Sequence, residues 1–166
     1  MISFRILKSF DANLIGKLIK LEVDNLGREA AVNEWQLPVL IRYGKFVVAE
    51  NENGDIIGVC EMLRQWGQPG QAGQAGQAGQ PPAAFIHSFY IEESFRHRGI
   101  GKNLLENVID ILKKDGFKSV QLTVDPGNKP ALNLYGRFGF VEKLLEIGEY
   151  GEGRDRVLME LAFDGV

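Results

Sequence analysis

Arg96-His97-Arg98-Gly99-Ile100-Gly101 lies between an apolar run, residues 84–91, and an amphipathic segment, residues 102–115. The apolar run is typical of a buried strand, and the spacing of the leucine and valine residues after Gly101 predicts a helix that ends at Gly116. The first N–H groups of a helix have no partner inside it, and the helix dipole places about half a positive charge there. A glycine-bearing turn at this point, with Arg96, Arg98 and Lys102, therefore predicts a phosphate-binding site.

Two common phosphate-binding motifs do not fit this turn. A Walker loop would need glycine where Arg96 stands and a hydroxyl residue where Asn103 stands. A dinucleotide fingerprint would need a third glycine at the position of Leu104. The sequence therefore excludes both motifs and leaves either another kind of phosphate ligand or a structural glycine turn with solvated basic residues.

A second segment of the sequence narrows the choice of phosphate ligand. Arg96-His97-Arg98-Gly99-Ile100-Gly101 fits the Arg/Gln-x-x-Gly-x-Gly/Ala signature of the GNAT family of N-acetyltransferases. Downstream, Asn128-Lys129-Pro130-Ala131-Leu132-Asn133-Leu134-Tyr135-Gly136-Arg137-Phe138-Gly139-Phe140 resembles the family's Asn-x-x-Ala-x-x-Leu-Tyr-x-x-x-Gly-Phe element. The two segments stand in the family's order, and residues 150–161 resemble its closing strand. The chain as a whole is thus similar to this family in element order.

The pattern of apolar residues predicts an α/β (α+β) mixed sheet with helices packed on it, in the order β-α-α-β-β-β-α-β-α-β-β. Asp11 is expected to cap the first helix, and the Asn53-Gly54 pair predicts a hairpin turn. A second helix is expected within residues 28–43, where core packing is the favoured role of Trp35 and Tyr43 over an aromatic wall for the substrate. The resemblance implies a GNAT-like acyl-CoA N-acyltransferase fold with a splayed central pair of strands.

Residues 67–82 read GQPGQAGQAGQAGQPP and contain no charged, aromatic or branched aliphatic side chain. Such a segment cannot offset the entropy lost on ordering, so we expect a flexible insert, inert rather than a lid over a pocket. Residues 1–166 are expected to form a single domain that contains this insert, and the resemblance implies that it is an acetyltransferase domain.

Composition excludes several functional classes. The 166 residues are 45% hydrophobic and 25% charged, with a net charge of −3, which favours a globular protein without a nucleic-acid partner. The single Cys60 forms no internal disulfide and, with His87 and His97, shows no metal-ligand spacing. No apolar run is long enough to span a bilayer, and the N-terminal residues lack the layout of a secretion signal. We expect a cytoplasmic protein that binds no metal and no membrane.

The resemblance implies acetyl transfer from acetyl-CoA, as cosubstrate, to a primary amine by direct attack in a ternary complex. The turn amides would hold the pyrophosphate, and backbone groups near Phe89 and Ile91 would pair with the pantetheine arm. Asn128 would contact the pantetheine or shape the bend after the preceding strand; an Asx-type turn is the alternative. The cofactor-binding residues expected on this basis are Phe89, Ile91, Arg96, His97, Arg98, Gly99, Ile100, Gly101, Lys102, Asn128 and Tyr135.

The resemblance also implies catalytic roles. Tyr135 stands where the family has its general acid, although a buried aromatic beside Phe138 and Phe140 is an alternative. His87 is a candidate base because its position resembles that of a histidine in arylalkylamine acetyltransferases and imidazole titrates near neutral pH. Glu61 is a rival base, a water chain a third possibility, and His87 as a core residue a further alternative.

The acceptor amine stays open. The resemblance implies that the two early helices, within residues 11–43, and the last hairpin select it. Thr123 stands where acetyltransferases of ribosomal-protein N-termini commonly have glutamate, which disfavours a peptide N-terminus. Six acidic against three basic residues from Glu142 to Glu160 favour a cationic amine, although a solvated hairpin also explains them. The family resemblance is compatible with a homodimer. The alternative function is a non-catalytic sensor of acyl-CoA.

Overall fold

The computed structural model describes residues 1–65 and 82–163, which divide into two compact units. Unit 1 contains Met1–Leu63 and Ser88–Asp110, and unit 2 contains Arg64–His87 and Ile111–Val166. Apart from Pro82, the insert predicted at residues 67–82 lies outside the described residues. Within the described ranges, no helix is both long and apolar enough to cross a membrane.

Unit 1 is built on antiparallel strands. The first pair runs from Ser3↔Glu50 to Ile6↔Val47, and the second includes Val48↔Val59. Gly54 forms the predicted turn between the second and third strands with a φ of 80°. The strands are β1 (Ser3–Ile6), β2 (Lys45–Glu50), β3 (Ile56–Gln65) and β4 (Ala83–Ile91), of which β3 and β4 continue into unit 2.

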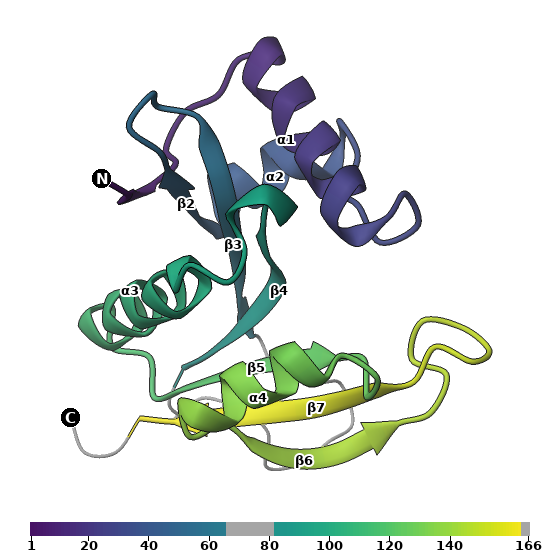
Figure 1. Ribbon diagram of the computed structural model, residues 1–166. Helices are drawn as coiled ribbons and strands as arrows, with labels where there is room; N and C mark the ends of the chain where they lie inside the picture. The colour runs from purple at the N-terminus through teal and green to yellow at the C-terminus, as the bar shows by residue number, and fades with distance from the viewer. Residues whose placement is uncertain (66–81, 164–166) are drawn as a thin grey trace. The chain divides into compact units, whose positions relative to one another are not determined.

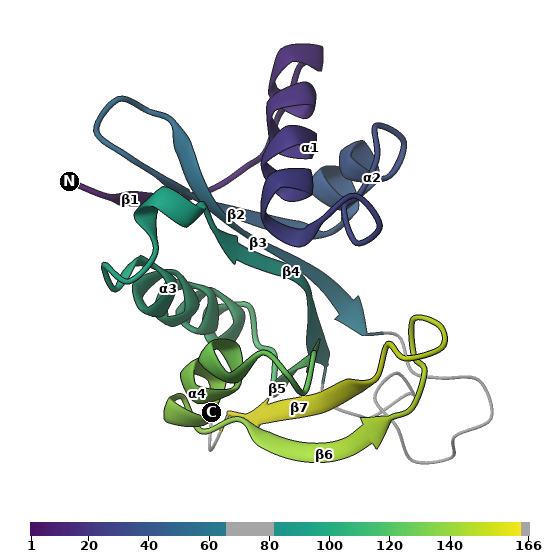
Figure 2. The ribbon, with the colours of Figure 1, turned by 45° about the vertical axis from the view of Figure 1, so that its right-hand side comes forward.

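Helix α1 (Ala12–Leu26) begins where the sequence predicts. The Asp11 side chain accepts a hydrogen bond of 2.8 Å from the Leu14 N–H, which confirms the predicted cap. Figures 1 and 2 show α1 beside α2 (Gln36–Tyr43) in unit 1. Their apolar faces and the sheet share one core, which contains Leu7, Ile15, Leu18, Val32, Leu37, Ile41, Phe46, Val48, Val59 and Tyr90.

The second helix lies within the predicted range, over Gln36–Tyr43, and ends at Gly44. Pro38 lies in its first turn, where the missing proline N–H breaks no intrahelical bond. The core packing expected of two aromatic residues at its ends is wrong. Trp35 and Tyr43 are 80% and 81% exposed, so they are not core residues. Leu37 and Ile41 supply the buried side of this short helix, which leaves the two aromatic side chains to solvent.

Helix α3 (Ile100–Lys114) follows β4 after a single 3-10 turn at Glu93–Phe95, which the sequence pattern missed. Gly116 follows the helix with a φ of 81°, the left-handed conformation expected of a glycine after a helix end. The predicted apolar positions are all buried: Leu104, Leu105, Val108, Ile109 and Leu112. The start of α3 is therefore fixed by its chain connection to β4 and by this apolar side.

Unit 2 joins a parallel pair to an antiparallel hairpin. Strand β4 pairs in parallel with β5 (Ser119–Val124) from Ala83↔Ser119 to Ile86↔Leu122, and the ladder ends there although β4 continues to Ile91. The remaining elements are α4 (Lys129–Arg137), β6 (Val141–Glu146) and β7 (Arg156–Ala162). The complete strand order is β1-β2-β3-β4-β5-β7-β6, which confirms a mixed sheet with the predicted order of elements.

Gly44→Ala should destabilise the protein, because a Cβ atom there would lie 2.6 Å from the Leu40 carbonyl oxygen and 2.7 Å from that of Met62. We expect the free energy of unfolding in urea to fall by about 2 kcal/mol. Gly16→Ala is the matched control: Gly16 lies inside α1, a Cβ atom there would meet nothing within 4 Å, and alanine favours a helix by about 1 kcal/mol. Equal unfolding curves for the two variants would contradict this account of Gly44.

Candidate active site

The turn before α3 presents a row of backbone N–H groups. The Arg96 N–H donates to the Glu93 carbonyl and the Asn103 N–H to that of Gly99, at 3.1 Å each. Between them, none of the N–H groups of residues 97–102 has a protein acceptor within the part of the chain that the structure describes. His97 has a φ of 61° and Gly99 one of 77°, and this left-handed geometry turns the chain into the helix.

The sequence predicts a phosphate-binding site at these N–H groups. They lie at the positive end of a 15-residue helix, and residues 96–99 are exposed. A Cβ atom at Gly101 would contact only the side chains of Ile91, at 3.5 Å, and Phe89, at 3.9 Å. The glycine thus keeps this side of the helix open for a close approach to the backbone.

The arginine side chains of the turn bind the protein itself. Arg96 donates from Nε to the Ile91 carbonyl, at 2.9 Å, and from Nη2 to Asn25 Oδ1, at 2.8 Å. Arg98 donates to the Ser94 carbonyl at 3.0 Å. Lys102 Nζ lies 3.4 Å from a Glu106 carboxylate oxygen, and both side chains are well exposed. Arg96 and Arg98 thus hold the turn in place, and the backbone N–H groups of residues 97–102 are left without protein acceptors in the described ranges.

The two candidate bases differ in exposure. His87 is exposed on β4, so the alternative that it is a core histidine is wrong. Glu61 is only 1% exposed, on β3 in unit 1. Burial, assisted by the charges of Glu22 and Glu61, raises the pKa of the neighbouring Tyr90 hydroxyl far above its ordinary value.

Cys60 is buried on the same strand as Glu61. Burial, together with the charge of Glu61, raises the pKa of its thiol well above the usual value, so the reactive thiolate is disfavoured. Among the described residues, no group of three or more histidine, cysteine, aspartate or glutamate side chains is arranged to hold a metal ion.

The expected Asn128 and Tyr135 lie in unit 2. Asn128 caps α4, because its side-chain oxygen accepts from the Ala131 N–H at 3.2 Å. The Asx-type turn belongs to Asp125, which accepts from the Gly127 N–H at 2.7 Å. Tyr135 is 6% exposed, and its ring lies 5.5 Å from that of Phe140, so the residue packs in the corner that the sequence pattern indicates.

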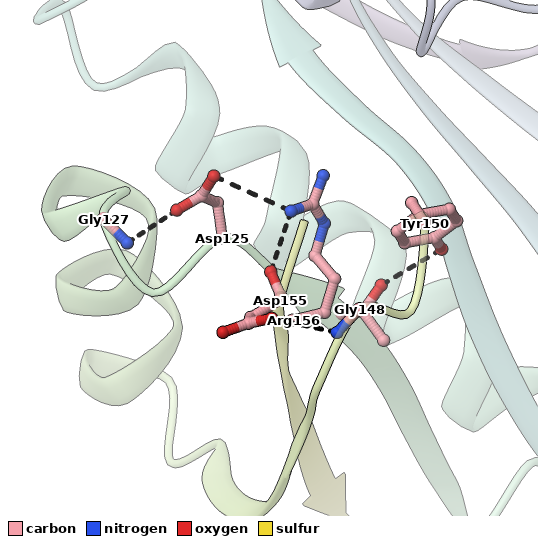
Figure 3. Close-up of polar contacts among 7 residues, drawn as sticks. Asp125, Gly127, Gly148, Tyr150, Asp155 and Arg156 are labelled. Atoms are coloured by element: carbon pink, nitrogen blue, oxygen red, sulfur yellow. Dashed lines mark hydrogen bonds and ion pairs between the residues drawn. The ribbon is translucent and has the colours of Figure 1, made fainter. Parts of the chain in front are cut away.

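Contacts between the β6–β7 connection and the end of β5 were not predicted (Figure 3). Arg156 lies 3.7 Å from Asp125 and places its guanidinium 5.0 Å from the centre of the Tyr150 ring. The Tyr150 hydroxyl lies 3.4 Å from Thr123 Oγ1, and Asp155 accepts a hydrogen bond from the Gly148 N–H. The contacts with β5 join residues more than 20 positions apart along the chain, so only the charges of Asp125 and Arg156 hint at them in the sequence.

Comparisons with known proteins agree with this fold. Residues 17–140 match the model of the Acetyltransferase (GNAT) family. An uncharacterized N-acetyltransferase of Methanocaldococcus jannaschii is 43% identical over 60 residues, 36% of this chain and 26% of that protein. An N-alpha-acetyltransferase of Sulfolobus acidocaldarius is 32% identical over 122 residues, 72% of this chain and 70% of that protein.

The solved structures include NAA60 of Arabidopsis thaliana in complex with acetyl-CoA, with a TM-score of 0.80 and 19% identity over 98% of this chain and all of that one. At this identity the likeness shows the fold. The family model covers most of the chain, and the Sulfolobus relative covers more than two thirds of it. On this evidence, the protein belongs to the GNAT family of acetyltransferases.

Proposed function

We propose that the protein transfers an acetyl group from acetyl-CoA to a primary amine. The observation that carries this proposal is the row of N–H groups at residues 97–102, which lie at the positive end of α3 without protein acceptors in the described chain. Such a row fits the pyrophosphate of coenzyme A. The two sequence segments typical of the family and its acetyl-CoA-bound structural neighbour add support.

Binding would rest on the backbone. Acetyl-CoA, when bound, supplies an acetyl thioester together with a diphosphate and a pantetheine arm. The N–H groups of residues 97–102 would hold the diphosphate, and the backbone near Phe89 and Ile91, beyond the end of the β4–β5 ladder, would pair with the arm as an added strand does. Asn128 caps the first turn of α4 and would shape the bend after β5.

The acceptor must lose a proton before it can attack. An alkylamine with a pKa near 10.4 is mostly protonated at pH 7, and freeing its lone pair costs roughly 4.6 kcal/mol. His87 would accept this proton, directly or through water, and its exposure supports it over the buried Glu61. Tyr135 would donate a proton to the departing thiolate, the role that the family resemblance implies.

A binding experiment tests whether the turn at residues 97–102 holds acetyl-CoA. Acetyl-CoA should raise the melting temperature of the wild-type protein, and Gly101→Glu should weaken its binding by roughly 100-fold, because the new carboxylate would repel the diphosphate. Gly16→Glu is the control, since it makes the same change at an exposed helical glycine with open space around it. Isothermal titration of each protein with acetyl-CoA measures the effect. Wild-type affinity in Gly101→Glu would place the coenzyme elsewhere.

A thiol-release assay over a panel of amines separates an enzyme from an acyl-CoA sensor. The panel contains spermidine, tryptamine, free lysine and peptides with an unblocked N-terminus or an internal lysine. Turnover with at least one amine is expected, and acetyl-CoA binding without any turnover would favour the sensor.

Tyr135→Phe should fold normally, because the hydroxyl is all that is removed and the ring contact with Phe140 is kept. We expect kcat to fall roughly 100-fold if the hydroxyl is the general acid, with little change in acetyl-CoA affinity. A thiol-release assay measures kcat, and isothermal titration measures the affinity for acetyl-CoA. Full turnover would rule out the acid role.

His87→Gln should remove the acidic limb of the pH profile of kcat/KM, because glutamine cannot be protonated as imidazole is. In the wild-type protein, activity should rise with pH along this limb as the imidazole loses its proton. His97→Gln is the control, since His97 is an exposed histidine of the turn. An unchanged acidic limb in His87→Gln would assign the base to Glu61 or to water.

A further inference from the structure

The carboxylate of Glu22 is buried in unit 1 and joins two separate parts of the chain. The side chain extends from α1 and is 1% exposed. Its Oε2 accepts a hydrogen bond of 3.0 Å from the Val32 N–H, and its Oε1 accepts one of 2.9 Å from the Ser88 hydroxyl. A buried carboxylate is costly unless it is hydrogen-bonded, so these bonds fix its position closely.

The two hydrogen-bond donors, the Val32 N–H and the Ser88 hydroxyl, belong to segments with different expected roles in binding. Val32 is 4% exposed and lies in the connection between α1 and α2, the region that the family resemblance associates with the acceptor. Ser88 lies on β4, directly before Phe89, whose backbone is expected to meet the pantetheine arm. One carboxylate therefore fixes the acceptor-side connection to the cofactor-binding strand.

A second contact from the same helix reaches the phosphate-binding turn. Asn25 follows Glu22 by three positions and so lies near the same face of α1. Its Nδ2 donates to the Leu21 carbonyl at 2.8 Å, which orients the amide, and its Oδ1 accepts from Arg96. Because Arg96 also binds the Ile91 carbonyl, α1 is joined to the end of β4 and to the turn by side-chain hydrogen bonds.

We propose that Glu22 is a positioning residue for the acceptor amine: it holds the α1–α2 connection at Val32 against β4 at Ser88. This inference rests on the proposed acetyl transfer and deepens it, because it names a residue that controls acceptor binding without touching the acceptor. The hydrogen bond between Asn25 and Arg96 keeps α1 in place, and Glu22 holds the α1–α2 connection against β4. The carboxylate acts as a double hydrogen-bond acceptor, and its role needs no proton transfer.

Three variants on α1 test the proposal. Glu22→Ala removes both hydrogen bonds and should raise the KM of the best amine from the panel by roughly 10-fold or more, with acetyl-CoA affinity within about 2-fold of wild type. In Glu22→Gln the amide oxygen can accept from Val32 while the amide nitrogen donates to Ser88, so KM should stay within about 3-fold. Asp24→Asn, which removes an exposed carboxylate of the same helix, should behave as wild type.

Hydrogen exchange supplies a readout that does not depend on activity. The Val32 N–H should exchange roughly 10-fold faster or more in Glu22→Ala than in the wild type, and at the wild-type rate in Asp24→Asn. If Glu22→Ala does not fold, Ser88→Ala, which removes the hydrogen bond from β4 to Glu22 and keeps the one from Val32, should still raise the acceptor KM, whereas Glu22→Gln should keep it near the wild-type value.

Two results would overturn the proposal. One is a folded Glu22→Ala protein with wild-type acceptor KM and wild-type Val32 exchange. The other is a Glu22→Gln protein whose kcat falls roughly 100-fold with an altered pH profile, because this would make Glu22 a proton acceptor. A wild-type protein without turnover on any amine would instead refute the proposed function, and Val32 exchange would then decide whether Glu22 fixes the connection.

Discussion

The unsatisfied N–H groups at the start of α3 are the constraint on which the proposed cofactor site depends. A helix that follows a strand after a tight turn cannot pair its first amides internally, and in the described residues the protein supplies no acceptor for those of residues 97–102. An anion at this point recovers the lost hydrogen bonds and meets the helix dipole. The glycines allow the turn, and the buried apolar side of the helix holds it in place.

The charged side chains of unit 1 contribute to the structure through directional hydrogen bonds as well as through their charge. Arg96 is a donor to two protein oxygens, one on β4 and one on α1, so its removal would loosen the turn as well as reduce the local positive charge. Glu22 is likewise placed where water is excluded and both oxygens have donors. Buried or half-buried polar contacts of this kind are directional, and they can fix the positions of segments that apolar packing alone would hold only approximately.

Much of the local structure follows from short-range patterns. The cap at Asp11, the turn at Gly54 and the apolar side of α3 all agree with the spacing of a few neighbouring residues. Within residues 28–43, the exact start of the second helix depends on the Asn33 side chain, whose Oδ1 accepts from the N–H groups of Trp35 and Gln36, and on the burial of Leu37. Trp35 faces solvent although it is aromatic, since hydrophobicity by itself does not say which side of a short helix faces the core.

The sequence by itself determined the family, the order of the elements and the location of the turn proposed to bind phosphate, because each depends on residues close together along the chain. Tertiary structure decided that His87 is exposed and Glu61 buried, and it brought Glu22 to Val32 and Ser88 and Tyr150 to Thr123. Burial and long-range hydrogen bonds depend on which surfaces of distant segments meet, and no local pattern of residue types encodes that. What the sequence determines and what the tertiary structure decides differ in the range of the interactions. Backbone turns and helix ends depend on neighbouring residues, whereas the partners of a buried hydrogen-bond acceptor come from distant parts of the chain.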